Sequence, residues 1–327
     1  MKAKSGNQKG TIAPKNKTAE DFTINQWMEI FRKIYEDVDS KRTPVQMWVA
    51  ATSHFTAMGE AIRRMHFSDL MLAATHAFCW MCSFVMKCNS EKGTVFTLNE
   101  SFSALVACKY PLVCGHCHER PCHCNPKRMD EKSDKAARYQ ELLNLRAKLA
   151  DAPDTYGVYQ WLEVFNDIYG RLIHMLTLES IGFHFLEEAG EELTAIRSLM
   201  QLQRAPDENI EGIDKAFLTK LSTFGGVVEL YEKYAGQKPE THKQDAEAIK
   251  ARLVHAKVEM FIEFADTFSW FCSILYKIMS IAKNCKDDNC SFVQPAFRER
   301  LLQEYLPEGT PQCPSCKECP CKCVFYN

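Results

Sequence analysis

The chain has 327 residues, of which 46% are hydrophobic and 25% are charged, and its formal net charge at pH 7 is −2. This composition is typical of a soluble globular protein, and the length accommodates two ordinary domains. A charge so close to zero gives no electrostatic reason to expect nucleic acid as a partner. We see no apolar run long enough to cross a bilayer and no signal-peptide stretch at the N-terminus, so we expect a cytoplasmic protein without membrane contact.

The first third of the chain predicts a flexible tail followed by helices. Residues 1–20 are basic, polar and nearly free of large apolar side chains, so they cannot bury enough surface to become ordered. Residues 22–38 carry apolar side chains at helical spacing, and helices are also predicted at 44–66 and 67–88. The last of these is apolar nearly all round, which indicates a helix inside a bundle. Proline, glycine and β-branched alternation are sparse, so we expect an all-α fold.

The chain contains an internal duplication. QWMEIFRKIY at 26–35 recurs as QWLEVFNDIY at 160–169, a shift of 134 residues. HAFCWMCSF at 76–84 recurs as DTFSWFCSI at 266–274, a shift of 190. The second copy therefore holds extra residues, at about 201–250, between two of its helices. Such self-similarity predicts two tandem helical bundles.

The duplication divides the chain into four parts. We predict a basic tail at 1–20, a first repeat at 21–125, a charged helical connector at 126–156 and a second repeat at 157–327. The two repeats are expected to pack against each other as a pseudo-dimer, because the apolar segments Phe67–Cys88 and Val258–Tyr276 are too apolar to be covered within one copy.

Each repeat ends in a cluster of cysteines with the spacing C-x2-C-x4-C-x-C. Four thiolates on two tight turns suit tetrahedral zinc, and a cytoplasmic location disfavours disulfides, while an iron–sulfur cluster stays open. We predict two closed structural zinc sites, each fastening the end of its own bundle. The two predicted ligand sets are Cys114, Cys117, Cys122 and Cys124, and Cys313, Cys316, Cys321 and Cys323.

Carboxylates recur at helical spacing in the second repeat. Glu187, Glu188 and Glu191 lie within five residues, with Glu191 four and three positions after the other two, so a helix would place them on a shared face, with Glu192 more to the side. Taken alone they would fit a solvated acidic face. Glu263 and Asp266 are three residues apart in a segment too apolar to face water, and carboxylates there need a partner or a metal.

The order E-E-x-x-E followed by E-x-x-D resembles the motif of the MazG-type all-α nucleoside triphosphate pyrophosphohydrolases. The resemblance covers roughly residues 158–284, with a longer spacer between the motif helices than that family has. It implies a Mg²⁺-dependent enzyme that cleaves a nucleoside triphosphate to the monophosphate and pyrophosphate. It also implies that Glu188, Glu191, Glu263 and Asp266 hold the metal and that Glu187 is a ligand or orients water.

The first repeat lacks every motif carboxylate. Ser53, His54, Ala57, Ala73 and His76 stand where the second repeat has its acidic residues. We therefore interpret the first repeat as a degenerate, non-catalytic partner whose residues line the far side of the acidic site. The substrate-binding candidates are Trp161, Trp270, His54, Arg63 and His76. Further homo-oligomerisation stays open.

A non-enzymatic reading competes with hydrolysis. The chain would then be a helical scaffold, fastened by zinc, that binds nucleotides or proteins. The retention of all five carboxylates in only one copy argues against this alternative. A Mg²⁺-dependent turnover assay over a nucleotide panel separates the two hypotheses.

Overall fold

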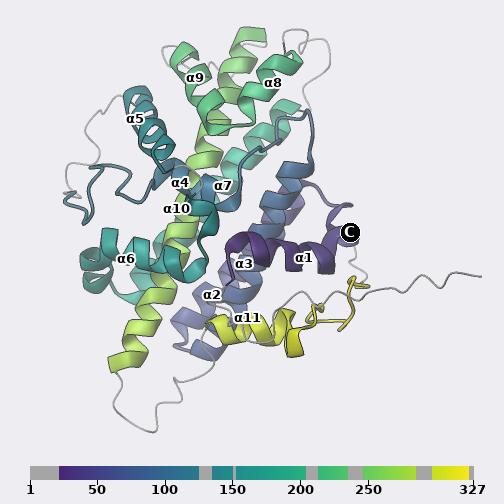
Figure 1. The fold of residues 1–327 in the computed structure, drawn as a ribbon, viewed down its shortest axis with the longest axis vertical. Helices are drawn as coiled ribbons and strands as arrows, with labels where there is room; N and C mark the ends of the chain where they lie inside the picture. The colour runs from purple at the N-terminus through teal and green to yellow at the C-terminus, as the bar shows by residue number, and fades with distance from the viewer. Residues whose placement is uncertain are drawn as a thin grey trace, which may run out of the picture.

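The computed structural model describes residues 22–124, 135–149, 152–203, 213–234, 246–284 and 297–323. Within these ranges the chain forms helices and no strand, which confirms the predicted all-α class (Figure 1). The basic tail, Cys285 and Cys290 lie outside the described residues. The helices are α1 (Ile24–Asp39), α2 (Pro44–Arg63), α3 (Phe67–Ser90), α4 (Phe102–Lys109), α5 (Lys135–Ala147), α6 (Val158–Met175), α7 (Leu178–Gln203), α8 (Lys215–Leu221), α9 (Phe224–Tyr234), α10 (Ala246–Asn284) and α11 (Phe297–Tyr305), with short 3₁₀ turns at Ala152–Thr155 and Pro307–Gly309.

The helices of the two repeats begin at matching positions. α1 and α6 begin at residues 24 and 158, and α2 and α7 begin at 44 and 178, so both pairs keep the shift of 134. The repeated glutamine explains the common start, because it caps the helix. Gln26 Oε1 accepts a hydrogen bond from Thr23 N over 2.9 Å, and Gln160 Oε1 accepts one from Gly157 N over 2.8 Å. A Cβ at Gly157 would lie 2.5 Å from the carbonyl oxygen of Phe22, so this cap requires glycine.

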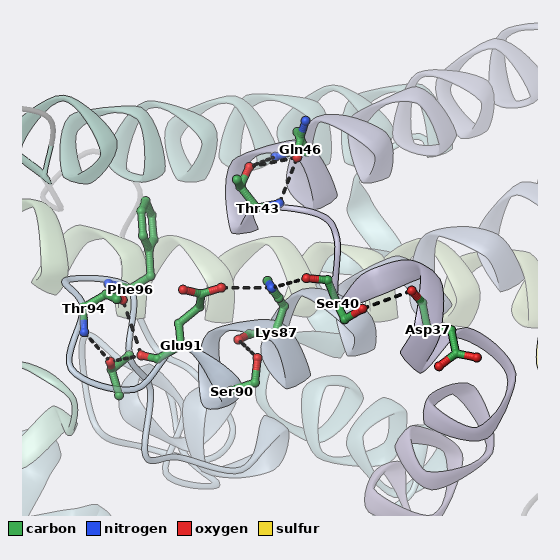
Figure 2. A network of polar contacts seen from close by, with 10 residues as sticks. Asp37, Ser40, Thr43, Gln46, Lys87, Ser90, Glu91, Thr94 and Phe96 are labelled. Carbon is green, nitrogen blue, oxygen red and sulfur yellow. Dashed lines mark hydrogen bonds and ion pairs between the residues drawn. The ribbon is translucent and has the colours of Figure 1, made fainter. Parts of the chain in front are cut away.

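The turn between α1 and α2 is held against the end of α3 by one lysine (Figure 2). Lys87 Nζ donates a hydrogen bond to the carbonyl oxygen of Ser40 over 3.1 Å and pairs with Glu91 over 2.9 Å. Thr43 caps α2 together with Gln46, and Pro44 occupies the first turn, where its missing N–H is not needed. These contacts fix the angle between α1 and α2.

Aromatic side chains of α3 and α10 join the two repeats. The rings of Phe78 and Phe271 stack with centroids 6.4 Å apart, and those of Phe84 and Phe264 stack at 6.2 Å. Along the sequence α3 is long and apolar enough to cross a membrane, contrary to the sequence prediction that no segment is. However, 72% of its most apolar window is buried inside the fold, as in the core helix of a soluble protein.

The last helix of each repeat packs on the other repeat. α4 follows α3 in the chain but lies against α10, and α11 follows α10 but lies against α3 (Figure 1). The ring contacts repeat with the roles exchanged. Tyr110 meets Phe165 of α6 at 5.2 Å between centroids, and Tyr305 meets Phe31 of α1 at 5.0 Å. Each repeat therefore completes the core of the other repeat with its own C-terminal segment. We call these segments, residues 102–124 and 297–323, the arms.

The extra residues of the second repeat include α8 and α9. Together with α5, these two helices cover the N-terminal end of α10 (Figure 1). The Tyr139 ring of α5 contacts the Tyr231 ring of α9, with 5.3 Å between their centroids. Part of the predicted connector is therefore packed against the second repeat. The insertion extends α10 at the end far from the α6 contact and does not interrupt the helix.

Candidate functional site

An acidic cluster forms where α7 packs along α10. Glu188 and Glu191 on α7 and Glu263 on α10 place ligand oxygens within 4.8 Å of one another. Glu263 is buried, and its Oε2 has no hydrogen-bond partner. A buried carboxylate oxygen without a partner is costly, so this donor set fits a hard cation better than it fits an empty core.

Burial makes the cluster resist full ionisation. Burial and the neighbouring Asp266 raise the pKa of Glu263 well above its usual range. The same two causes raise the pKa of Glu188. Like charges held together in a desolvated site hold protons until a cation replaces them, and sites of this kind are often functional.

Asp266 is engaged by two residues of the first repeat. Lys109, at the end of α4, forms an ion pair with Asp266, and the hydroxyl of Tyr110 donates a hydrogen bond to its other carboxylate oxygen. Burial opposes the charge on Lys109, but Asp266 and Glu263 outweigh it and raise the pKa of the amine. The first repeat therefore reaches the acidic cluster, but through its arm.

The two outer glutamates of the α7 run lie apart from the cluster. Glu187 is exposed and faces His184, with 3.3 Å between His184 Nδ1 and the carboxylate. Glu192 is fully buried on another side of α7, where neither carboxylate oxygen has a hydrogen-bond partner. Burial raises the pKa of Glu192 well above its usual value, with only Lys257 opposing the shift. Glu192 is thus part of the core.

The structure places the predicted substrate-binding residues elsewhere. Trp161 is completely buried, and its Nε1 donates a hydrogen bond to Ser103 over 3.2 Å, so it belongs to the core. Trp270 is half-buried and stacks on His184 at 4.8 Å between ring centroids. Arg63 is exposed and paired with Glu60 at 2.8 Å. His54 and His76 line a separate cavity with α1 and α11 and do not face the acidic cluster.

Both cysteine clusters have the geometry of a four-thiolate metal site. The Sγ–Sγ distances are 3.7 Å for Cys114–Cys124 and 3.9 Å for Cys117–Cys122, and the second cluster gives 3.7 and 3.8 Å for the equivalent pairs. Sulfurs arranged tetrahedrally with bonds of about 2.3 Å to one ion would lie about 3.8 Å apart. All described cysteines are free thiols, and these two sets can hold a structural metal such as zinc.

Each cysteine cluster docks on the first helix of the other repeat, which corrects the expectation that it fastens its own bundle. Cys122 N donates a hydrogen bond to Ile168 O of α6 over 2.9 Å, while Cys321 N donates one to Ile34 O of α1 over 2.6 Å. Ile34 and Ile168 are 134 residues apart and hold the same place in their repeats. The clusters are thus the outer ends of the exchanged arms.

Sequence reasoning missed Lys109 and Tyr110 as site residues. A usable signal exists, because Phe102 and Tyr110 have the same spacing as Phe297 and Tyr305. Matching the arms in this way brings the two tyrosines into register, after which the second arm has four more residues before its first cysteine. Lys109 then corresponds to Glu304, so the charge at this position is reversed between the arms.

The three glutamates could hold a metal ion beside the largely buried ammonium group of Lys109. Such a site suits a substrate that carries several negative oxygens. Comparisons of this chain with family models, with curated proteins and with solved structures find no match.

Proposed function

We propose that the chain is a Mg²⁺-dependent nucleoside triphosphate pyrophosphohydrolase, as the carboxylate motif of the second repeat implies. The observation that carries the proposal is the convergence of Glu188, Glu191 and Glu263 within 4.8 Å, with one oxygen of Glu263 buried and unpartnered. Water would attack the α-phosphorus, and the bond to the bridging oxygen would break to release the monophosphate and pyrophosphate.

Three glutamates would hold the metal. Carboxylate oxygens are the ligands that Mg²⁺ prefers, and the raised pKa values of Glu188 and Glu263 mean that protons leave when the ion enters. When bound, Mg²⁺ neutralises phosphate charge and lowers the pKa of a coordinated water. Glu187 is exposed and lies apart from the three converging groups, so we assign it no metal contact.

Lys109 and Asp266 would act together beside the metal ligands. Asp266, which accepts a hydrogen bond from the Tyr110 hydroxyl, holds the largely buried amine of Lys109 at the edge of the cluster. A fixed ammonium there can bind the non-bridging phosphate oxygens and stabilise the charge that develops on the leaving pyrophosphate. In this proposal Asp266 positions Lys109, where the sequence motif implied a metal ligand.

The scaffold alternative draws support from the same ion pair. Lys109 already neutralises Asp266, so part of the acidic cluster is stable without metal. In that reading the carboxylates stabilise the interface between the repeats, and the chain turns over no nucleotide.

Turnover decides between the two. Purified, zinc-loaded protein is incubated with each ribo- and deoxyribonucleoside triphosphate, with and without Mg²⁺, and monophosphate and pyrophosphate are quantified. We expect equal amounts of both products, and none without Mg²⁺ or in Glu191→Gln. Release of inorganic phosphate as first product, or no turnover of any nucleotide, contradicts the proposal and favours the scaffold.

A further inference from the structure

The first repeat contains a cavity of about 190 Å³ that the proposed reaction does not use. It lies between α1, α2, α3, α11 and the second cysteine cluster and is partly open to solvent. Five of its walls are aromatic or imidazole rings, which belong to Tyr35, His54, His76, Trp80 and Tyr305.

This cavity takes the place that the acidic cluster has in the second repeat. His54 corresponds to Glu188 at the shift of 134, and His76 corresponds to Asp266 at the shift of 190. Tyr305, at one wall, is the counterpart of Tyr110. At these matched positions the first repeat has a cavity lined by imidazoles where the second repeat has its carboxylates.

The two imidazoles are neutral, and one has a buried ring nitrogen without a hydrogen-bond partner. The His54 and His76 rings meet edge to face at 5.1 Å between centroids. Burial lowers the pKa of both, that of His54 to about 4, so neither carries a charge at neutral pH. His76 Nε2 is buried and has no hydrogen-bond partner. A ligand that pairs with this nitrogen would remove an unsatisfied group from the interior.

The lining offers no uncompensated positive charge. Its Arg42 pairs with Asp39 over 2.9 Å, and Cys313 of the second cysteine cluster adds negative charge when four thiolates hold zinc. The guanidinium of Arg42 also lies over the Trp80 ring at 4.7 Å from its centroid, which makes a flat, polarised wall. A phosphate would therefore find no uncompensated cation in this lining.

Metal binding fits the cavity poorly. Among the described residues, no third His, Cys, Asp or Glu ligand atom converges with the two histidines, whereas three do so in the acidic cluster. Two imidazoles alone are too few for a protein zinc site. The volume also matters, because sites for drug-sized molecules occupy about 300–1,000 Å³. The cavity is smaller than that, so it fits one planar ring system and not a whole nucleoside triphosphate.

We propose that this cavity binds the base of an uncharged nucleoside, as a non-catalytic ligand site of the first repeat. Aromatic walls would stack on the faces of a purine or pyrimidine, and a rotation of the His76 ring would bring its unpartnered Nε2 to a ring nitrogen or carbonyl of the base. The sugar would extend through the opening beside Ser315, which is exposed at the rim.

The test is calorimetric titration of full-length, zinc-loaded protein with adenosine, guanosine, cytidine, uridine and thymidine. No turnover is needed, so the result is independent of the proposed hydrolysis. We expect one of them to bind once per chain with Kd between about 10 μM and 1 mM. His76→Leu, which keeps the volume and removes the ring nitrogens, and Trp80→Leu, which removes the stacking wall, should each weaken binding at least about tenfold.

Two controls make the outcome decisive. Glu191→Gln, in the acidic cluster, should bind the nucleoside as the parent protein does, and thermal melting with zinc content shows that each variant is folded. If His76→Leu does not fold, the partly exposed Trp80 provides the second variant. The proposal is overturned by the absence of binding by all five nucleosides, by equal binding in Trp80→Leu, by loss of binding in Glu191→Gln, or by uptake of a third metal ion that depends on His76.

Discussion

The hydroxyl of Tyr169 in the second repeat donates a hydrogen bond to Cys114 Sγ of the first repeat over 3.4 Å. The contact recurs in mirrored form, because Tyr35 of the first repeat lies 3.8 Å from Cys313 Sγ of the second. Tyr35 and Tyr169 are 134 residues apart. The exchange of arms is therefore a property of both repeats, and it joins each cysteine cluster to a helix of the other repeat.

Metal content should follow this exchange. We expect about two zinc ions per chain by elemental analysis, and about one in either Cys117→Ser or Cys316→Ser. Cys117→Ser should raise amide hydrogen exchange in α6 of the second repeat, whereas Cys316→Ser should raise it in α1 of the first. Each variant is the control for the other. Faster exchange in the repeat that carries the mutation would contradict the crossed docking, and iron with visible absorbance would contradict zinc.

Neighbouring glutamates on α7 should differ sharply in turnover. Glu191→Gln removes a charge that a hard cation needs, so we expect at least about a 100-fold loss of Mg²⁺-dependent hydrolysis with the fold intact. Glu192→Gln should stay within about twofold, because Glu192 is buried away from the cluster and burial favours its neutral form. Steady-state kinetics on the two variants checks this. Equal losses in the two variants would contradict the placement of Glu191 in the metal site and of Glu192 outside it.

Lys109 should affect substrate binding and chemistry together. Replacing it with methionine keeps most of the side-chain volume, removes the ammonium group and leaves Asp266 with Tyr110 alone, so we expect kcat/KM to fall by about 10–100-fold. Lys109→Arg should recover part of the loss, and Asp266→Asn should resemble Lys109→Met. If Lys109→Met keeps full kcat/KM, the residue only fastens the interface.

Magnesium should stabilise the protein more as the pH rises. Burial and Asp266 raise the pKa of Glu263 above its ordinary 4.5, so the folded, metal-free protein binds a proton that the unfolded chain has lost. Its stability therefore falls as the pH rises above that ordinary value. Because a bound ion replaces the proton, the Mg²⁺-induced rise in Tm should be larger at about pH 8 than at about pH 6. An equal or smaller rise at the higher pH would exclude this linkage, and Glu191→Gln should show little rise at either.

Separating the repeats should disable the acidic site. A fragment of residues 150–327 lacks Lys109, Tyr110 and the cysteine cluster that docks on α6, so we expect aggregation, self-association or loss of turnover. Adding residues 1–149 in trans should restore activity. A 150–327 fragment that is monomeric and fully active would show that the first repeat is not part of the site.

Several helices and the two cysteine clusters could be predicted because they depend on local patterns. Apolar spacing located the first three helices, the repeated Gln-Trp start located α1 and α6, and cysteine spacing located both clusters, whereas the short helices α4 and α11 were not predicted. The crossing of the arms could not be predicted, since Phe31 and Phe165 offer the same ring to an incoming tyrosine. A pattern that is identical in both copies cannot say which copy receives which arm.

The burial of Glu192 and the separation of His54 from the acidic cluster could not be predicted, and for a similar reason. Periodicity places Glu192 at the side of α7 but does not show that the α10 residue Lys257 lies inside the same region of the core, donating hydrogen bonds to the carbonyls of Val95 and Thr97. Likewise, aligning the repeats places His54 opposite Glu188 without showing that the two positions line separate hollows. Distances between helices, which the sequence does not state, decided both cases.

The exchanged arms also set the order in which the chain can fold during its synthesis. Residues 102–124 leave the ribosome well before α6 and the site on α10 that receive them have been made. At a translation rate of about 5–20 residues per second, roughly 10–30 s pass between the synthesis of this arm and the completion of α10. α1 stays uncovered for longer, because residues 297–323, which pack on it, are the last described segment to be translated. Neither half can close by itself on the ribosome, so a prematurely terminated product would expose the aromatic surface of α1 to chaperones and proteases.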